Sequence, residues 1–253
     1  MKTLFTIGVL LVSISSSVAQ SNDTTRVWRA GFYMSVVGQE VDLDDLNREL
    51  AQVGIPTLTS GLVGFSFGFT NRHRDQNSYG MAQFSYMSTF DDGNDAGNNA
   101  QLDLWKISVT GQYDVIPNEK WLIFPYLQLS TNLARLKVSS VVNTPSFQGS
   151  LSNLGSPDEL VKRYSTGMFI SGGIGAGIER RLVFPGSIGF IGFSAGYEIS
   201  PQSEWQTEGG NYFLANSPAF QTNGLVFEFR FRIEINPNTD RNQEPQGIYK
   251  FFQ

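Results

Sequence analysis

The chain has 253 residues, a formal net charge of −5 and no cysteine. The lack of cysteine excludes a disulfide-stapled secreted domain and a lipoprotein acylated at an N-terminal cysteine. The acidic balance, without a basic cluster, argues against a nucleic-acid-binding protein. There are 26 glycines and 20 phenylalanines but only 16% charged residues, so the hydrophobic side chains must be arranged in alternation rather than in long runs.

The chain begins with a predicted secretory signal. Residues 1–19 contain Lys2, an apolar run that ends at Val12, and a stretch of small residues that ends at Ala19. This pattern is typical of a cleaved signal peptide, and the apolar run is too short for a transmembrane helix. No later stretch reaches 18 consecutive apolar residues, so we expect no membrane-spanning helix.

Eight segments with strand periodicity follow. Each alternates apolar and polar side chains, over roughly the nine to eleven residues that a tilted strand needs to cross a bilayer. The predicted strands are 28–37, 61–70, 79–90, 102–115, 121–134, 164–179, 188–199 and 224–235. Their connections alternate between short turns and long loops, as in outer-membrane barrels. We therefore predict an all-β fold, an eight-stranded antiparallel up-and-down transmembrane β-barrel with short periplasmic turns and long extracellular loops.

The two faces of the predicted strands differ in chemistry. One face is apolar, as in the row Phe227, Phe229 and Phe231, and the other holds small and polar residues such as Gly64 and Ser66. A solvent-facing sheet would carry more charge, whereas the crowded interior of an eight-stranded barrel favours glycine and serine around a few ion pairs. We therefore predict apolar side chains toward lipid and polar ones toward the lumen.

Nine charged residues belong to the predicted lumen face. They are Arg29, Lys106, Asp114, Glu179, Glu198, Glu228, Arg230, Arg232 and Glu234. Because unpaired buried charge is costly, the near balance of four basic and five acidic groups predicts mutual pairing. A packed, paired lumen would be closed.

Two further patterns fit a barrel wall. The glycines of Gly172 to Gly177, "GGIGAG", lie inside a predicted strand with no following helix, which favours close packing over a phosphate-binding loop. Aromatic residues lie near the ends of predicted strands, as interfacial girdles do. They are Trp28, Trp105, Trp121, Tyr113 and Tyr197.

The first long loop predicts a short amphipathic helix. Leu43, Leu46, Leu50 and Val53 recur at helical spacing, and Gly54 closes the segment. At the extracellular mouth, this helix would act as a lid or partner-binding element, or simply as a cap over the open end of the barrel.

The second long loop is acidic. Asp91, Asp92 and Asp95 resemble a calcium loop only superficially, because the terminal bidentate glutamate and the spacing of an EF-hand are missing. A solvated turn is the plainer interpretation, and these three residues are a weak metal candidate. We predict no metal and no cofactor.

The size, signal peptide, strand number and loop asymmetry resemble the small OmpA/OmpX-like outer-membrane barrels, and more specifically the single-domain outer-membrane β-barrel family of Bacteroidota. Thr222, Gly224, Phe227 and Phe229 match the insertion signal that the barrel assembly machinery reads in such proteins. The resemblance implies a signal peptide over 1–19, a barrel over 20–235 and a periplasmic tail over 236–253. It also implies a Gram-negative outer membrane, with membrane lipid, lipopolysaccharide and an envelope protein as partners.

The residues for catalysis are scarce. His73 is the single histidine and lies in a predicted periplasmic turn, away from the extracellular face where barrel lipases act. We therefore predict a non-enzymatic structural or interaction barrel. Two alternatives stay open: a narrow pore or transport-accessory barrel for small solutes, and a soluble lipocalin-like binder whose phenylalanine faces line a cavity.

Overall fold

The computed structural model describes eight ranges of the chain. These are residues 28–73, 77–89, 98–116, 120–141, 159–184, 187–207, 213–214 and 217–235. The predicted signal peptide and the predicted tail lie outside them. Within these described ranges, no helix is long and apolar enough to cross a membrane.

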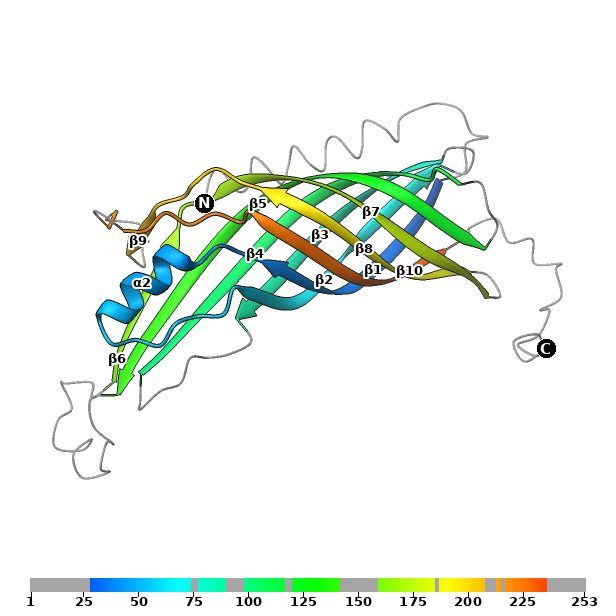
Figure 1. Ribbon diagram of the computed structural model, residues 1–253. Helices are drawn as coiled ribbons and strands as arrows, with labels where there is room; N and C mark the ends of the chain where they lie inside the picture. Colours follow the sequence, from blue (N-terminus) through cyan, green and yellow to red (C-terminus); the bar gives the residue numbers. More distant parts are fainter. Residues whose placement is uncertain are drawn as a thin grey trace, which may run out of the picture.

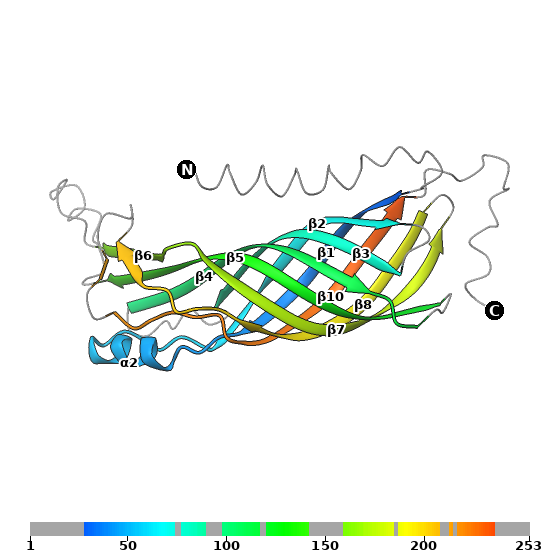
Figure 2. The ribbon, with the colours of Figure 1, turned by 90° about the horizontal axis from the view of Figure 1, so that it is seen from above.

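Antiparallel strands make up most of the described chain (Figures 1 and 2). The elements are β1 (Trp28–Glu40), α2 (Asp44–Gln52), β2 (Gly61–His73), β3 (Ser78–Thr89), β4 (Asn98–Tyr113), β5 (Trp121–Val141), β6 (Glu159–Thr166), β7 (Phe169–Phe184), β8 (Ser187–Ile199), β9 (Trp205–Thr207) and β10 (Gly224–Ile235). Each of the eight predicted strands overlaps one or two of these elements.

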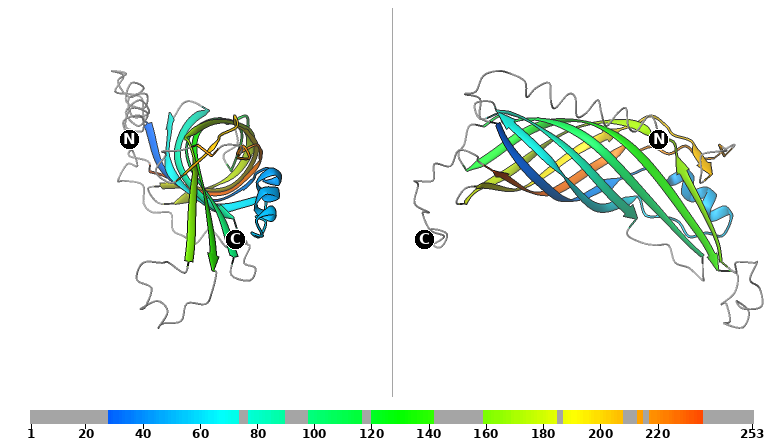
Figure 3. Two further views of the ribbon diagram at one scale, coloured as in Figure 1. Left: turned by 90° about the vertical axis from the view of Figure 1, so that its left-hand side faces the viewer. Right: turned by 180° about the vertical axis from the view of Figure 1, so that it is seen from behind.

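Eight of the described strands close into a barrel. Neighbours pair in the order β1, β2, β3, β4, β5, β7, β8 and β10, and β10 pairs back onto β1. The left view of Figure 3 looks down the barrel axis, so that the strands form a ring. The predicted closed, eight-stranded antiparallel barrel is therefore confirmed. We call the end with the β2–β3, β4–β5 and β7–β8 connections the short-turn end, and the opposite end, with α2, β6 and β9, the long-loop end.

The predicted sixth strand, 164–179, is wrong in one respect, because it is interrupted at Gly167 and Met168. Arg135 pairs with Ser165 in β6, whereas Asn132 pairs with Phe169 in β7. Three residues therefore face two residues of β5 at this point, which is the arrangement of a bulge. The 21-residue β5 continues past the bulge and pairs with β6, which extends the wall beyond the closed barrel at the long-loop end.

The outer wall of the barrel is apolar, and its buried charged side chains lie inside. Phe69 and Leu127 are 70% and 67% exposed, although both are strongly hydrophobic. Successive residues of a strand point to opposite faces, so in β10 the buried charges alternate with outward side chains such as Phe227 and Phe229. The lipocalin-like alternative is wrong, because Phe227 and Phe229 are 43% and 54% exposed on the outside instead of lining a cavity.

Candidate functional site

The middle of the lumen holds a group of ion-paired side chains that we call the charge layer. Its members are Lys106, Glu179, Glu198, Glu228, Arg230, Arg232 and Glu234, and all are buried. Each comes from an inward-facing position of β4, β7, β8 or β10. Glycines opposite them make room, since a Cβ on Gly192 would lie 2.6 Å from Cγ of Glu179.

Glu179 lies between two arginines of β10. Its Oε2 accepts a hydrogen bond of 2.6 Å from Nη2 of Arg232, and its Oε1 lies 3.5 Å from Nη1 of Arg230. Arg232 also donates to Oε1 of Glu234. Each guanidinium therefore meets two carboxylates, because Arg230 donates to Oε2 of Glu228 at 2.6 Å as well. Hydrogen-bonded pairs of this kind offset the cost of burying charge.

Glu228 extends this network to β1, the strand that pairs with β10. Its Oε1 accepts a 2.7 Å hydrogen bond from Ser35 of β1, whose Oγ accepts one of 2.9 Å from the hydroxyl of Tyr33. Ser194 of β8 accepts a 2.8 Å hydrogen bond from Arg230. The charge layer thus joins β1, β7, β8 and β10.

Lys106 forms a separate bridge across the lumen. Its ammonium donates 2.6 Å hydrogen bonds to Oε1 of Gln39 on β1 and to Oε2 of Glu198 on β8. Thr222 completes the group, because its hydroxyl donates to the other oxygen of Glu198 at 2.9 Å and its carbonyl accepts from Gln39 at 3.2 Å. One side chain of β4 therefore ties together strands from the far side of the barrel.

The short-turn end of the lumen is filled by an aromatic base. Its buried members are Tyr79, Leu122, Phe124, Tyr126, Ile188 and Phe190. Arg232 lies over the rings of Phe190 and Tyr79, with its Cζ 4.0 and 4.7 Å from the ring centroids. Gly177 leaves space for Phe124, since a Cβ there would lie 2.5 Å from the ring. The aromatic base therefore depends on the alternate glycines of β7.

The long-loop end is filled by an apolar plug that the sequence analysis did not foresee. Its buried members include Leu46 and Leu50 of α2, Leu62 of β2, and Leu102 and Leu104 of β4. Further members are Val37, Val41, Leu43, Leu58, Met87, Ala100, Ala134, Leu136, Val138, Phe169, Trp205 and Phe220. The signal was present in "LDLWKI", where apolar residues occupy both faces of the predicted strand.

α2 forms as predicted from the leucine spacing, and it packs into the apolar plug. Leu43 lies just before the helix and is buried together with Leu46 and Leu50. Val53, expected on the same face, is exposed because it follows the last helical turn. Asn47 fixes the helix to the next segment through two hydrogen bonds with the backbone of Leu58, of 2.9 and 2.7 Å.

One stripe of polar side chains in the lumen has no protein partner. Oγ of Ser108, Oγ1 of Thr110 and both amide atoms of Gln112 are buried without a hydrogen-bond partner among the described residues. They follow Lys106 along the inward face of β4, toward the short-turn end. This polar stripe stops at the apolar plug, because the next inward residue beyond Lys106 is Leu104.

Other predicted site residues lie elsewhere. Asp114 is buried, and its Oδ1 accepts a 3.2 Å hydrogen bond from the backbone of Ile116 in the turn after β4. Among the described residues it forms no ion pair with a lumen cation, so its predicted pairing stays a prediction. The side chain of Arg29 is outside the described residues, as are Asp91, Asp92 and Asp95. The described part of the chain contains no group of three potential metal ligands.

The predicted insertion-signal residues have distinct surroundings. Thr222 is fully buried against Glu198, whereas Phe227 and Phe229 point outward from β10. Gly224 touches the backbone of β1, since a Cβ there would lie 2.0 Å from the carbonyl oxygen of Glu40.

The predicted girdle residues are only partly described. Trp121, Tyr113 and Tyr197 are exposed on the outer surface. Trp105 is partly exposed and packs against Tyr86 with the two rings tilted and their centroids 5.5 Å apart. The side chains of Trp28 and His73 lie outside the described residues.

The chain matches no protein-family model and no curated protein sequence. Among solved structures, neisserial surface protein A is similar with a TM-score of 0.38 and 12% identity, over 83% of this chain and 96% of that one. Ail of Yersinia pestis, solved with the heparin analogue sucrose octasulfate, has a TM-score of 0.44 and 10% identity, over 82% and 97%. The N-terminal β-barrel domain of Pseudomonas aeruginosa OprF has a TM-score of 0.28 and 13% identity, over 79% and 96%.

At these identities the likeness concerns the fold alone, and the expected Bacteroidota family stays a prediction. The strand pairing itself defines the architecture: a closed, eight-stranded antiparallel β-barrel with an apolar exterior.

Proposed function

We propose that the chain is a non-enzymatic barrel of a Gram-negative outer membrane, with a closed lumen, that acts as a structural or interaction protein through its long-loop end. The observation that carries the proposal is the inside-out distribution of side chains. A ring of exposed aliphatic and aromatic residues needs an apolar surrounding, while the charged residues are buried and paired inside.

The interior supports a closed lumen. From the long-loop end to the short-turn end, it consists of the apolar plug, the charge layer and the aromatic base. A solute would have to displace packed apolar side chains at both ends and break buried ion pairs between them. The long-loop end, which carries α2 and the extension of β5 and β6, is then the surface left for an envelope partner or lipopolysaccharide.

In this proposal, Thr222, Gly224, Phe227 and Phe229 are the residues that the barrel assembly machinery reads, and membrane lipid contacts the outer wall. The orientation follows the usual asymmetry of such barrels, with short turns in the periplasm. Residues 1–19 would be removed on export and residues 236–253 would lie in the periplasm.

The test combines membrane fractionation, gel mobility with and without boiling, and planar-bilayer conductance of the purified protein. Recovery in the outer membrane, a boiling-dependent shift and no conductance steps would support the proposal. Recovery in the soluble fraction, or a barrel that conducts steadily, would contradict it.

A narrow pore is the second candidate, because the polar stripe of Ser108, Thr110 and Gln112 resembles the lining of a hydrated path. The apolar plug blocks this stripe at the long-loop end. If the pore were the function, conductance would appear in the wild-type protein. If the plug and the aromatic base both close the barrel, the wild type should not conduct, and replacing Leu62 and Leu104 by serine should not open it while the aromatic base stays packed.

A further inference from the structure

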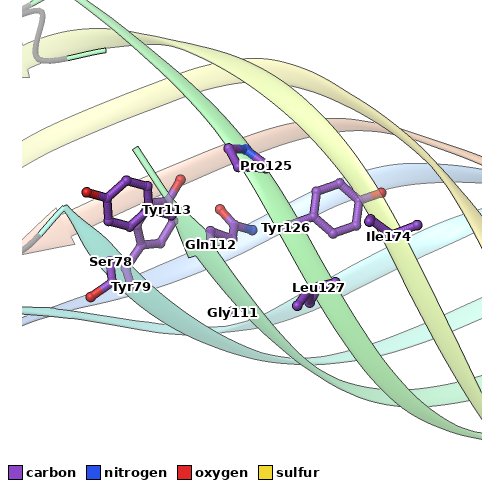
Figure 4. Close-up of a pocket in the computed structure, with 9 residues that line it drawn as sticks. All are labelled: Ser78, Tyr79, Gly111, Gln112, Tyr113, Pro125, Tyr126, Leu127 and Ile174. Carbon is purple, nitrogen blue, oxygen red and sulfur yellow. The ribbon is translucent and has the colours of Figure 1, made fainter. Parts of the chain in front are cut away.

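The outer wall of the barrel has a groove of about 490 Å³ near the short-turn end (Figure 4). It crosses β3, β4, β5 and β7, and its lining is almost entirely apolar. Its outward-facing lining residues are Ser78, Gly111, Tyr113, Pro125, Leu127 and Ile174, and the buried residues Tyr79, Gln112 and Tyr126 also line it. We call it the wall groove.

Missing side chains create the wall groove. Gly80 of β3 pairs directly with Gly111 of β4, and both occupy outward positions. A Cβ added at either glycine would meet no heavy atom within 4 Å, so nothing inside the barrel requires a glycine at either position. The wall beside them is tall, since Leu127 and Ile174 stand opposite each other in the register and Ile174 is 63% exposed.

The rim of the groove changes in polarity along the barrel axis. On the side of the short turns, Tyr113 pairs with Ser78, and both residues are exposed. Toward the middle of the barrel, the rim consists of Leu127 and Ile174. Tyrosine prefers sites with one wet and one apolar end, so Tyr113 fits the level of the membrane surface. An edge with hydroxyl groups next to an aliphatic trough is therefore complementary to an amphiphile whose polar group lies at that surface.

We propose that the wall groove binds one acyl chain of a phospholipid from the leaflet at the short-turn end, with the ester region of that lipid beside Tyr113 and Ser78. This inference rests on the proposed membrane location. A protein occupant fits less well, since a stable interface uses about 20–30 residues from each partner, whereas nine residues line the groove. Side chains protrude around the groove and make the surface uneven. A flexible acyl chain can follow such a surface more readily than the rigid wall of a second protein can.

The test fills the groove without disturbing the fold. Gly111→Leu places a side chain in the trough, where the structure has open space. Gly172→Leu is the matched control, because Gly172 is also an exposed glycine on the outer wall with open space at its Cβ, yet lies outside the groove. Both variants and the wild type are reconstituted in vesicles of phosphatidylethanolamine and phosphatidylglycerol, extracted in mild detergent, and examined by native mass spectrometry for retained phospholipid.

We expect the wild type and Gly172→Leu to retain one phospholipid, and Gly111→Leu to retain it about tenfold less, which corresponds to about 1.4 kcal/mol of binding free energy. Equal retention in all three proteins would overturn the inference. So would a lipid-free species of doubled mass that Gly111→Leu abolishes, because the groove would then be an interface between two copies.

Two measurements keep this result separate from the proposed function. A boiling-dependent gel shift shows that each variant has closed its barrel. Gly80→Leu, which adds a side chain next to the groove at the residue paired with Gly111, is a second variant if Gly111→Leu does not fold. If the wild type is not recovered in the outer membrane, the proposed function fails. If it is recovered there but retention does not depend on Gly111 or Gly80, only the lipid site fails.

Discussion

Replacing Arg232 by methionine should strongly destabilise the barrel. Arg232 is buried, it bridges Glu179 and Glu234, and it lies over the rings of Phe190 and Tyr79. Methionine keeps much of the side-chain volume but removes the charge. Glu234 would then have no cation within salt-bridge distance among the described residues, and Glu179 would keep only Arg230, at 3.5 Å.

The magnitude follows from the burial of these groups. Removing one partner of a buried ion pair leaves an uncompensated charge and costs about 3–5 kcal/mol. The double variant Arg232→Met with Glu234→Gln removes the stranded carboxylate, so it should lose less stability than the single variant. Part of the loss should remain in the double variant, because Glu179 still lacks its 2.6 Å partner.

The assay is urea unfolding of the refolded protein in detergent micelles, followed by tryptophan fluorescence and by the fraction of protein with folded gel mobility. Four proteins form a double-mutant cycle: the wild type, Arg232→Met, Glu234→Gln and the double variant. A single variant within about 0.5 kcal/mol of the wild type, the usual range for uncoupled surface changes, would refute the pairing of Arg232 in a packed lumen.

Three further variants test the other layers. Leu102→Ala should lower the free energy of unfolding by about 2–5 kcal/mol, because it opens a cavity in the apolar plug. The same urea titration measures this loss. A loss below about 1 kcal/mol would contradict the packing of the plug. Gly177→Val should prevent formation of the folded gel band, because its side chain overlaps Phe124, and adding Phe124→Leu should restore the band. Asn47→Ala should cost about 1–3 kcal/mol locally by removing both hydrogen bonds to Leu58; we expect faster proteolysis at residues 41–60 with an unchanged global midpoint.

The strand pattern of this chain was predictable because alternation is a local property. In β10 every second residue is apolar from Leu225 to Ile235, and the outward members need no specific partner. Which face of each strand points into the barrel could also be predicted. Its glycine and serine residues are small and uncharged, whereas a solvated sheet surface carries larger charged side chains. The same reasoning predicted α2 from its leucine spacing.

The layers of the lumen were not predictable to the same degree. Leu102 and Leu104 occupy inward positions that the alternation assigns to polar residues, and only the packing of α2 and the surrounding strands explains them. Asp114 follows the inward parity of β4, and its hydrogen bond with the backbone of Ile116 depends on the turn after the strand. The extra residue at Gly167 and Met168 is equally hidden, because a bulge depends on the register of the partner strand.

The layered lumen also fixes the register in which the strands pair. A slip of one residue would turn every side chain to the wrong face, but a slip of two residues preserves the alternation that lipid and lumen require. The interior does not tolerate that second kind of slip. Moving β4 by two residues toward the long-loop end would bring the ammonium of Lys106 to the level of Leu104, inside the apolar plug, and away from Gln39 and Glu198. Because stagger and strand number together set the diameter of a barrel, the order of the layers also selects its width.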